Sequence, residues 1–367
     1  MRPSWIEIDL DAIRHNVSVI VEAIAPTRLC AVVKADAYGH GDIPVAQAAL
    51  SGGAEMLAVA LVEEGVRLRE AGISVPILLL SEPDCDDVSE LEKWRLTPTV
   101  YRKDLVQALA SATRKKMPVH VKIDTGMHRV GADIKTGIEL VQLIDQHEIL
   151  DLEGVWTHLA VSEEDDEFTR LQLDRFNTFV AEAHKVGVQP KALHVANTAG
   201  ALAFSVARYD IARIGLGIYG LRPAPHIGFD LDLRPAMRLV SRISFVRSVS
   251  EGERVSYGRC RPMPSDGTLA TVPIGYADGV HRRLFAAGGE VLIRGKRHPF
   301  AGNVTMDQII VDSGGTPVEV GDEVVLIGRQ GSGEISADQW AQWLGTISYE
   351  IVCSFGPRLP RRYRGES

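Results

Sequence analysis

The chain has 367 residues, of which 45% are hydrophobic and 24% are charged. This length suits about two domains, or one barrel of roughly 250 residues followed by a smaller domain. Lysine and arginine (40) are fewer than aspartate and glutamate (48), so the formal net charge is -8. Such a chain has no basic excess with which to bind nucleic acid or an anionic membrane surface.

The cysteines and the apolar runs indicate the cellular compartment of the protein. Cys30, Cys85, Cys260 and Cys353 stand apart and form no CxxC pair or metal-ligand spacing. Isolated thiols favour a reducing compartment. Charges interrupt the N-terminal segment, and no apolar run approaches the roughly 20 residues of a membrane helix. We therefore expect a cytoplasmic protein that binds no metal, membrane or nucleic acid.

The first two thirds of the chain alternate short apolar runs with longer amphipathic segments. This alternation predicts parallel strands joined by helices, and uninterrupted apolar runs are typical of strands covered on both faces. The clearest helices are expected over residues 62–71 and 168–186. Eight strands are expected, the number that a (β/α)8 barrel needs, over residues 29–33, 56–60, 77–80, 96–100, 119–123, 153–157, 192–195 and 211–214.

The pattern changes after Arg234. Several β-like runs follow, separated by Gly, Pro and Asp turns, and only residues 336–344 are predicted to be helical. The predicted fold class is therefore α/β, with a (β/α)8 barrel over residues 1–234 and a mostly antiparallel β domain over residues 235–367. The β-like runs cover residues 240–249, 268–274, 289–293, 308–311 and 320–327.

Reactive side chains follow the predicted barrel strands directly, where barrel active sites lie. Lys34 follows the first strand, Lys122 lies in the fifth, and His158 follows the sixth. A lysine beside an apolar strand end is desolvated, which lowers its pKa and leaves a neutral amine able to form a Schiff base. Considered alone, Lys34 fits the more ordinary interpretation of a lysine that reaches solvent.

Residues 215–220 match the GxGxxG pattern. They follow the last barrel strand and precede a proline-rich segment that cannot open a helix, which excludes a dinucleotide site. The N–H groups of such a loop suit a phosphate, and barrel phosphate sites use the loops after strands seven and eight. Those loops hold Thr198, Gly215 and Leu216. A phosphate site is therefore favoured over a role of the glycines in packing alone.

Other candidates are ambiguous when considered alone. Arg213 lies in an apolar strand and needs a partner, either an acidic neighbour or a cofactor. Asp124 and Glu153 would suit a pair of glycosidase carboxylates, although no other feature supports that activity. Tyr257 and Tyr276 are predicted to be hairpin aromatics.

Together, these segments resemble the alanine racemase family, which consists of pyridoxal-phosphate enzymes of fold type III. The matching stretches follow the family order over nearly the whole chain: AVVKADAYGHG, VKIDTGMHRVG, THLA, HVANTAG, RIGLGIYGL, VSYG, IGYADG, GNVTMDQ and TISYE. The resemblance implies racemisation of L-alanine and D-alanine, which supplies D-alanine for peptidoglycan. It also implies a head-to-tail homodimer with shared active sites, and a first strand, residues 5–10, that joins the β domain.

The resemblance implies two acid/base residues on opposite faces of the substrate. Lys34 would hold the pyridoxal 5'-phosphate covalently and take the proton from the D-isomer. Tyr257 of the partner subunit would take the proton from the L-isomer, and His158 would tune its phenol. Arg213 would hydrogen-bond the pyridine nitrogen and leave it unprotonated, which favours racemisation over transamination.

The remaining site residues also follow from the resemblance. Arg129 would contact the substrate carboxylate, and Lys122 would be the often carbamylated lysine that braces Arg129. The partner subunit would supply Met306, whose amide holds the carboxylate, and Tyr276, which narrows the access channel. The cofactor would also be bound by Tyr38, His158, Asn197, Thr198, Gly215 and Leu216.

Substrate selectivity and two other functions stay open. Pro357 stands where many members have a tyrosine that touches the phosphate, so a broader amino-acid racemase is one alternative. A decarboxylase of the same fold type is disfavoured, because those enzymes place an acidic residue where Arg213 stands. A non-catalytic pyridoxal-phosphate-binding barrel is disfavoured by the β domain that carries Tyr257.

Overall fold

The computed structural model describes residues 2–228 and 230–365, and these form two compact units. One unit, here called the barrel unit, comprises Asp11–Ala37 and Gly41–Arg234. The other, the sheet unit, comprises the described residues up to Leu10, Tyr38–His40, and those from Pro235 onward.

The barrel unit contains two parallel four-stranded sheets, ordered β4-β3-β2-β9 and β5-β6-β7-β8. Backbone hydrogen bonds join them at both seams, from Leu79 N to Thr97 O (2.9 Å) and from Arg213 N to Ala196 O (3.0 Å). The predicted (β/α)8 barrel is therefore confirmed. Its strands are β2 (Arg28–Val32), β3 (Met56–Val59), β4 (Ile77–Leu79), β5 (Thr99–Val100), β6 (Met117–Lys122), β7 (Leu150–Trp156), β8 (Ala192–His194) and β9 (Ile211–Ile214).

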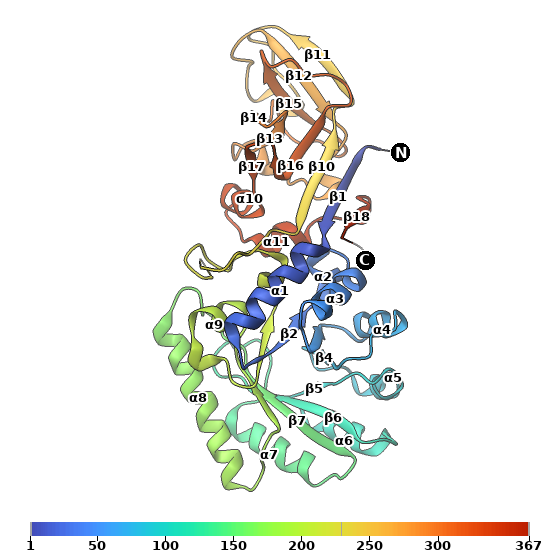
Figure 1. Ribbon diagram of the computed structural model, residues 1–367, viewed down its shortest axis with the longest axis vertical. Helices are drawn as coiled ribbons and strands as arrows, with labels where there is room; N and C mark the ends of the chain where they lie inside the picture. The colour runs from blue at the N-terminus through green and yellow to red at the C-terminus, as the bar shows by residue number, and fades with distance from the viewer. Residues whose placement is uncertain (1, 229, 366–367) are drawn as a thin grey trace. The chain divides into compact units, whose positions relative to one another are not determined.

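Helices follow the barrel strands (Figure 1). The longest, α8 (Asp166–Lys185), begins where the Asp165 side chain accepts a hydrogen bond from Phe168 N, and it buries Phe176 and Phe179. Asp166 and Glu167 in its first turn face the positive end of the helix dipole. The others are α1 (Leu10–Ile24), α3 (Asp42–Ser51), α4 (Val62–Glu70), α5 (Val88–Trp94), α6 (Lys103–Ala112), α7 (Ile134–Asp145) and α9 (Thr198–Ala203).

The sheet unit is built on a seven-stranded sheet and a three-stranded sheet. The larger has the order β14-β13-β16-β10-β1-β18, with β17 paired to β16, and the smaller has the order β11-β12-β15. Its strands are β1 (Ser4–Asp9), β10 (Met237–Arg242), β11 (Phe245–Val249), β12 (Gly267–Val272), β13 (Glu290–Ile293), β14 (Lys296–Pro299), β15 (Ile309–Gly314), β16 (Glu323–Gln330), β17 (Gly333–Ile335) and β18 (Arg361–Arg364).

Two expectations for this unit were wrong, and the strand β18 was not predicted. The single run predicted over residues 240–249 is two strands, because β10 and β11 belong to different sheets. A second helix, α11 (Ser348–Cys353), follows α10 (Ala337–Leu344). The arginine-rich segment of β18 is a strand parallel to β1, where Arg364 Nη2 lies 2.8 Å from Glu7 Oε2, so ion pairing replaces the apolar signal of a strand.

No helix within residues 2–228 and 230–365 combines the length and the apolar character needed to cross a membrane.

Candidate active site

Lys34 stands at the end of β2, at the start of an unusual turn. It is partly exposed and opens the short element α2 (Lys34–Gly39). Residues 35–38 have φ angles of 54°, 53°, 50° and 55°. Four successive non-glycine residues are therefore left-handed, at a cost of roughly 1–2 kcal/mol each. Strain of this kind is concentrated at functional sites, where the surrounding structure enforces it.

Basic side chains gather in the barrel unit around Lys122. The side chain is buried, and burial lowers its pKa to about 7, with further lowering by Arg129, Arg213 and Lys34. Asp124 opposes this shift. Several basic side chains with only one nearby carboxylate among the described residues are typical of a site that binds an anion.

Arg213 is fully enclosed within the barrel unit. Its Nη1 donates to His194 O (3.1 Å), and its Nη2 donates to Thr157 O (2.7 Å) and Val195 O (3.0 Å). Burial lowers its pKa to about 10, which still leaves it charged at pH 7. Its Nε donates to no group among the described residues, so this one N–H remains for another acceptor.

His158 is the neutral partner of this arginine. Its Nδ1 lies 3.4 Å from Arg213 Nη2. Burial lowers the pKa of His158 well below its usual range, and Arg213, Arg129, Lys122 and Lys34 lower it further. Because arginine only donates, Nδ1 accepts and the proton of the neutral imidazole lies on Nε2.

One tryptophan packs against two members of the basic cluster. Lys122 Nζ and Arg213 Cζ each lie 4.5 Å from the ring centre of Trp156. The indole is fixed because its Nε1 donates to Thr99 Oγ1 (3.2 Å). Trp156 thus supplies two cation–π contacts that offset some of the cost of burying these charges.

The two loops predicted to bind phosphate meet in the barrel unit. Thr198 Oγ1 accepts from Gly215 N (3.2 Å), and Leu216 follows at the start of a 3-10 turn. Asn197 caps α9 by accepting from Gly200 N (2.8 Å). A Cβ on Gly217 would lie 3.0 Å from Thr198 Cγ2, so this glycine also permits close packing.

The remaining candidates belong to the sheet unit. Tyr38 is buried with its ring 6.0 Å from that of Tyr349, and burial raises the pKa of its phenol. Tyr257, Tyr276 and Met306 are 71%, 42% and 53% exposed, which is unusual for large apolar side chains.

A single loop brings the last three together. Tyr276 N donates to Thr305 O (3.0 Å), and Ala277 N donates to Met306 O (3.1 Å). In the same loop, Asn303 Nδ2 donates to Tyr257 O (2.8 Å). The backbone of this loop therefore ties the three exposed side chains to one face of the sheet unit.

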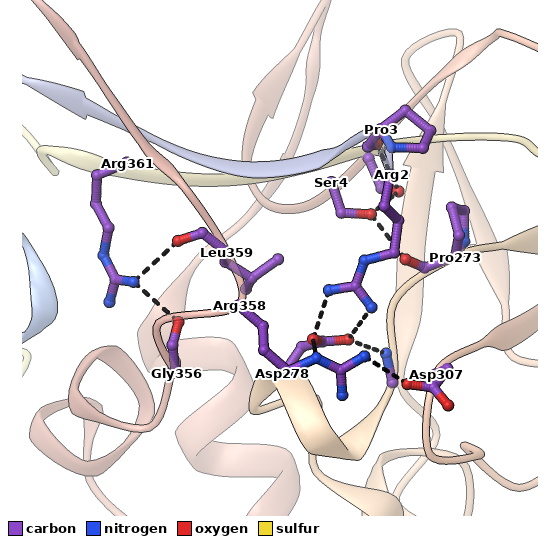
Figure 2. Close-up of polar contacts among 12 residues, drawn as sticks. Arg2, Pro3, Ser4, Pro273, Asp278, Asp307, Gly356, Arg358, Leu359 and Arg361 are labelled. Atoms are coloured by element: carbon purple, nitrogen blue, oxygen red, sulfur yellow. Dashed lines mark hydrogen bonds and ion pairs between the residues drawn. The ribbon is translucent and has the colours of Figure 1, made fainter.

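Ion pairs involving Asp278 and Asp307 join two of these segments (Figure 2). The Asp278 carboxylate is fully buried, and both terminal nitrogens of Arg2 donate to it, at 3.0 and 2.5 Å. Arg358 contacts Asp278 Oδ1 through Nε (3.4 Å) and Asp307 Oδ1 through Nη2 (2.6 Å). Arg358 thus bridges the turn that follows Tyr276 and the loop that contains Met306.

The sequence did not single out His120 or Trp156 as parts of the site. His120 Nδ1 lies 2.8 Å from Nε2 of His194, which in turn contacts Arg213. The available signal was a histidine between the two valines of a predicted strand, Val119 and Val121. No group of three or more His, Cys, Asp or Glu residues suited to a metal ion occurs in the described part of the chain.

The fold and the basic cluster define the class of protein, a two-unit α/β enzyme with its candidate site at the carboxyl ends of barrel strands. Residues 8–223 match the family described as "Alanine racemase, N-terminal domain", and residues 236–363 match "Alanine racemase, C-terminal domain". The chain therefore belongs to the alanine racemase family.

Relatives and solved structures agree over the full length. An alanine racemase from Symbiobacterium thermophilum is 44% identical, over 100% of this chain and 98% of the relative, and one from Nostoc is 42% identical, over 98% and 95%. The structure of alanine racemase from Bacillus anthracis with bound L-Ala-P is similar at 38% identity and a TM-score of 0.93, covering 100% of this chain and 96% of that one. A histidine racemase from Leuconostoc mesenteroides shares 28% identity and a TM-score of 0.90, covering 99% of this chain and 98% of that one.

Proposed function

We propose that this protein interconverts L-alanine and D-alanine with pyridoxal 5'-phosphate as cofactor. The observation that carries the proposal is the concentration of Lys122, Arg129 and Arg213 near Lys34 in a full-length member of the family. A doubly anionic phosphate, a phenolate and a substrate carboxylate are the groups that such a cluster suits.

The residues fit this cofactor on their own chemistry. Lys34 supplies an amine at the rim, and the unused Nε–H of Arg213 supplies one donor for a ring nitrogen. The loop amides of Gly215 and Leu216, with Thr198 and Asn197, suit the phosphate end. When bound, pyridoxal 5'-phosphate supplies an electron sink that acidifies the α-proton of an amino acid.

The protein's part in the reaction is to move one proton on each face of the substrate. Lys34 acts on the proton of the D-isomer, and Tyr257 of the partner subunit acts on that of the L-isomer. His158 is neutral with its proton on Nε2, so it can donate to the phenolate oxygen of Tyr257 and favour that anion. Arg129 and the amide of Met306 would orient the carboxylate, and Lys122 would brace Arg129.

We further propose a homodimer in which each sheet unit completes the partner's site. The exposure of Tyr257, Tyr276 and Met306 on one loop-bound face supports this, because apolar side chains of this size are normally covered. The four free cysteines support a cytoplasmic location. In that compartment the product D-alanine would serve peptidoglycan synthesis.

The test is to follow the optical rotation of pure L-alanine with the purified protein and pyridoxal 5'-phosphate. We expect the rotation to decay to zero as D-alanine accumulates. Cofactor binding with constant rotation would identify a non-catalytic binding protein, and carbon dioxide release would identify a decarboxylase. Parallel assays with L-serine and L-histidine measure how far the protein accepts larger substrates.

A further inference from the structure

The backbone around Lys34 is anchored on both sides. Before it, Val33 N donates to Ala58 O (2.9 Å), and Val33 O accepts from Ala37 N (3.0 Å). One residue earlier, the buried Tyr219 hydroxyl donates to Val32 O (2.9 Å). After Lys34, the chain leaves the strand and enters the left-handed turn, where the N–H of Ala35 needs an acceptor of its own.

That acceptor is the carboxylate of Glu64, a side chain only 7% exposed. Its Oε1 accepts from Ala35 N (2.6 Å). Its Oε2 accepts from Ala60 N (2.7 Å) and Leu61 N (3.1 Å), which follow β3. One buried carboxylate therefore ties the residue after Lys34 to the end of the neighbouring barrel strand.

A helix cap explains only half of this arrangement. Glu64 is the third residue of α4, and its contact with Leu61 N is the reciprocal bond of a capping box. That function needs one oxygen. The second oxygen reaches across to the strained turn, and it forms the shorter, charge-assisted contact.

We propose that Glu64 is a positioning residue for Lys34, and this inference rests on the proposed function. The Glu64 carboxylate holds the peptide plane after Lys34, while Val33 holds the plane before it, so the Cα–Cβ bond of Lys34 has one direction at the rim. Without the carboxylate, the turn relaxes toward a right-handed conformation, because the left-handed one is intrinsically unfavourable. The amine of Lys34 then moves off its reacting position.

The test compares Glu64→Gln with Glu63→Gln, its neighbour in the same helical turn. An amide has one acceptor oxygen and one donor nitrogen. Glu64→Gln therefore places an N–H donor against a backbone N–H, either that of Ala35 or those of Ala60 and Leu61. Apoprotein is mixed with pyridoxal 5'-phosphate, reduced with borohydride at set times, and digested to quantify the modified Lys34 peptide. Loss of one charge-assisted bond predicts about tenfold to hundredfold slower modification and a similar fall in kcat, with wild-type values for Glu63→Gln.

Glu64→Asp keeps the charge but retracts it by one methylene, and it is expected to fold and to give an intermediate rate of modification. A wild-type rate in either folded Glu64 variant would overturn the proposal. In the unsubstituted protein, hydrogen exchange at the Ala35 amide is expected to be slow, and exchange as fast as in an unstructured peptide would also overturn it. Failure of the wild-type protein to modify Lys34 at all would instead refute the proposed function.

Discussion

Arg213 Nη1 lies 3.1 Å from Nδ1 of His194, and this contact fixes the direction of a buried hydrogen-bond chain. Since arginine only donates, His194 accepts at Nδ1 and carries its proton on Nε2, which donates to His120 Nδ1 at 2.8 Å. His120 then carries its proton on Nε2, which lies 3.7 Å from Glu153 Oε2. Burial keeps the pKa of His194 well below its usual range, so this imidazole is neutral beside the guanidinium.

Arg213→Glu is expected to change the outcome of the reaction as well as its rate. The new carboxyl group would be buried beside the carbonyls of Thr157 and Val195, which cannot stabilise its anion, so its pKa would rise. Such an acid can pass its proton to the pyridine nitrogen, and the resulting pair of pyridinium and carboxylate strengthens the electron sink and permits reprotonation at the wrong carbon. We expect slower racemisation and measurable pyruvate from L-alanine, assayed with lactate dehydrogenase. Unchanged pyruvate and an unchanged spectrum would contradict the role given to Arg213, and Arg213→Lys is the charge-preserving control.

Lys34→Ala is expected to abolish both racemisation and the visible absorption of lysine-bound pyridoxal phosphate. The substitution removes the amine at the rim without adding bulk to the turn that follows it. Lys185→Ala is the matched control, because Lys185 is an exposed lysine that pairs with Glu182 on α8. A Lys34→Ala protein with full activity would refute the assignment.

Tyr257→Phe is expected to slow turnover from L-alanine while the cofactor stays bound. The phenol oxygen is the only atom removed, and Tyr257 is exposed in the single chain, so stability should hardly change. Exchange of the α-proton in deuterated water should fall by two or more orders of magnitude for L-alanine, roughly the effect of losing an acid/base group. Exchange from D-alanine, which depends on Lys34, is the internal control. Equal exchange rates from L-alanine in both proteins would count against Tyr257.

The sequence predicted the barrel better than the sheet unit, and the reason is physical. Each of the eight barrel strands overlaps one of the predicted apolar runs, because most residues of these strands are covered on both faces of the sheet. In the sheet unit, β18 is held by the ion pair between Arg364 and Glu7, which has no hydrophobic pattern in the sequence. The change of sheet between β10 and β11 is also not visible in the hydrophobic pattern.

The residues of the candidate site also differ in how well the sequence predicted them. Lys34 and Arg213 stand out because a charged residue in or beside an apolar strand requires a partner. Glu64 did not stand out, since an acidic residue in the first turn of a helix is ordinary, and only the left-handed turn after Lys34 gives it a second donor. Roles that depend on a partner subunit, such as that of Tyr257, came from the resemblance alone and stay predictions.

Lys122 makes stability depend on pH in a defined direction. Its pKa is about 7 in the folded protein, against an ordinary value of 10.5. Between these values the unfolded chain binds more protons than the folded one, so stability rises with pH, by up to about 1.4 kcal/mol per pH unit. Urea unfolding of the apoprotein between pH 7 and 9, in buffer free of carbon dioxide to prevent carbamylation, should show this rise relative to Lys122→Met. Parallel curves for the two proteins would mean that Lys122 is not buried as a neutral amine.

Arg358 should govern substrate binding more than stability. It connects Asp278 and Asp307, and so holds the turn after Tyr276 against the loop of Met306 (Figure 2). Arg358→Gln loosens that loop, and with the Met306 amide, which we propose binds the carboxylate, less ordered, we expect KM for alanine to rise about tenfold, equivalent to roughly 1.4 kcal/mol of lost binding. The change in kcat should be smaller.

Arg2→Gln is the matched control for Arg358→Gln. Arg2 pairs with the same buried Asp278, whereas the contact with Asp307 comes from Arg358, so loss of Arg2 leaves a buried carboxylate with one cation fewer and should lower the Tm. KM for alanine should stay near the wild-type value, because Arg358 still bridges the two segments. If the two variants raise KM equally, the effect comes from Asp278 and general stability, and Arg358 has no separate part in holding the Met306 loop.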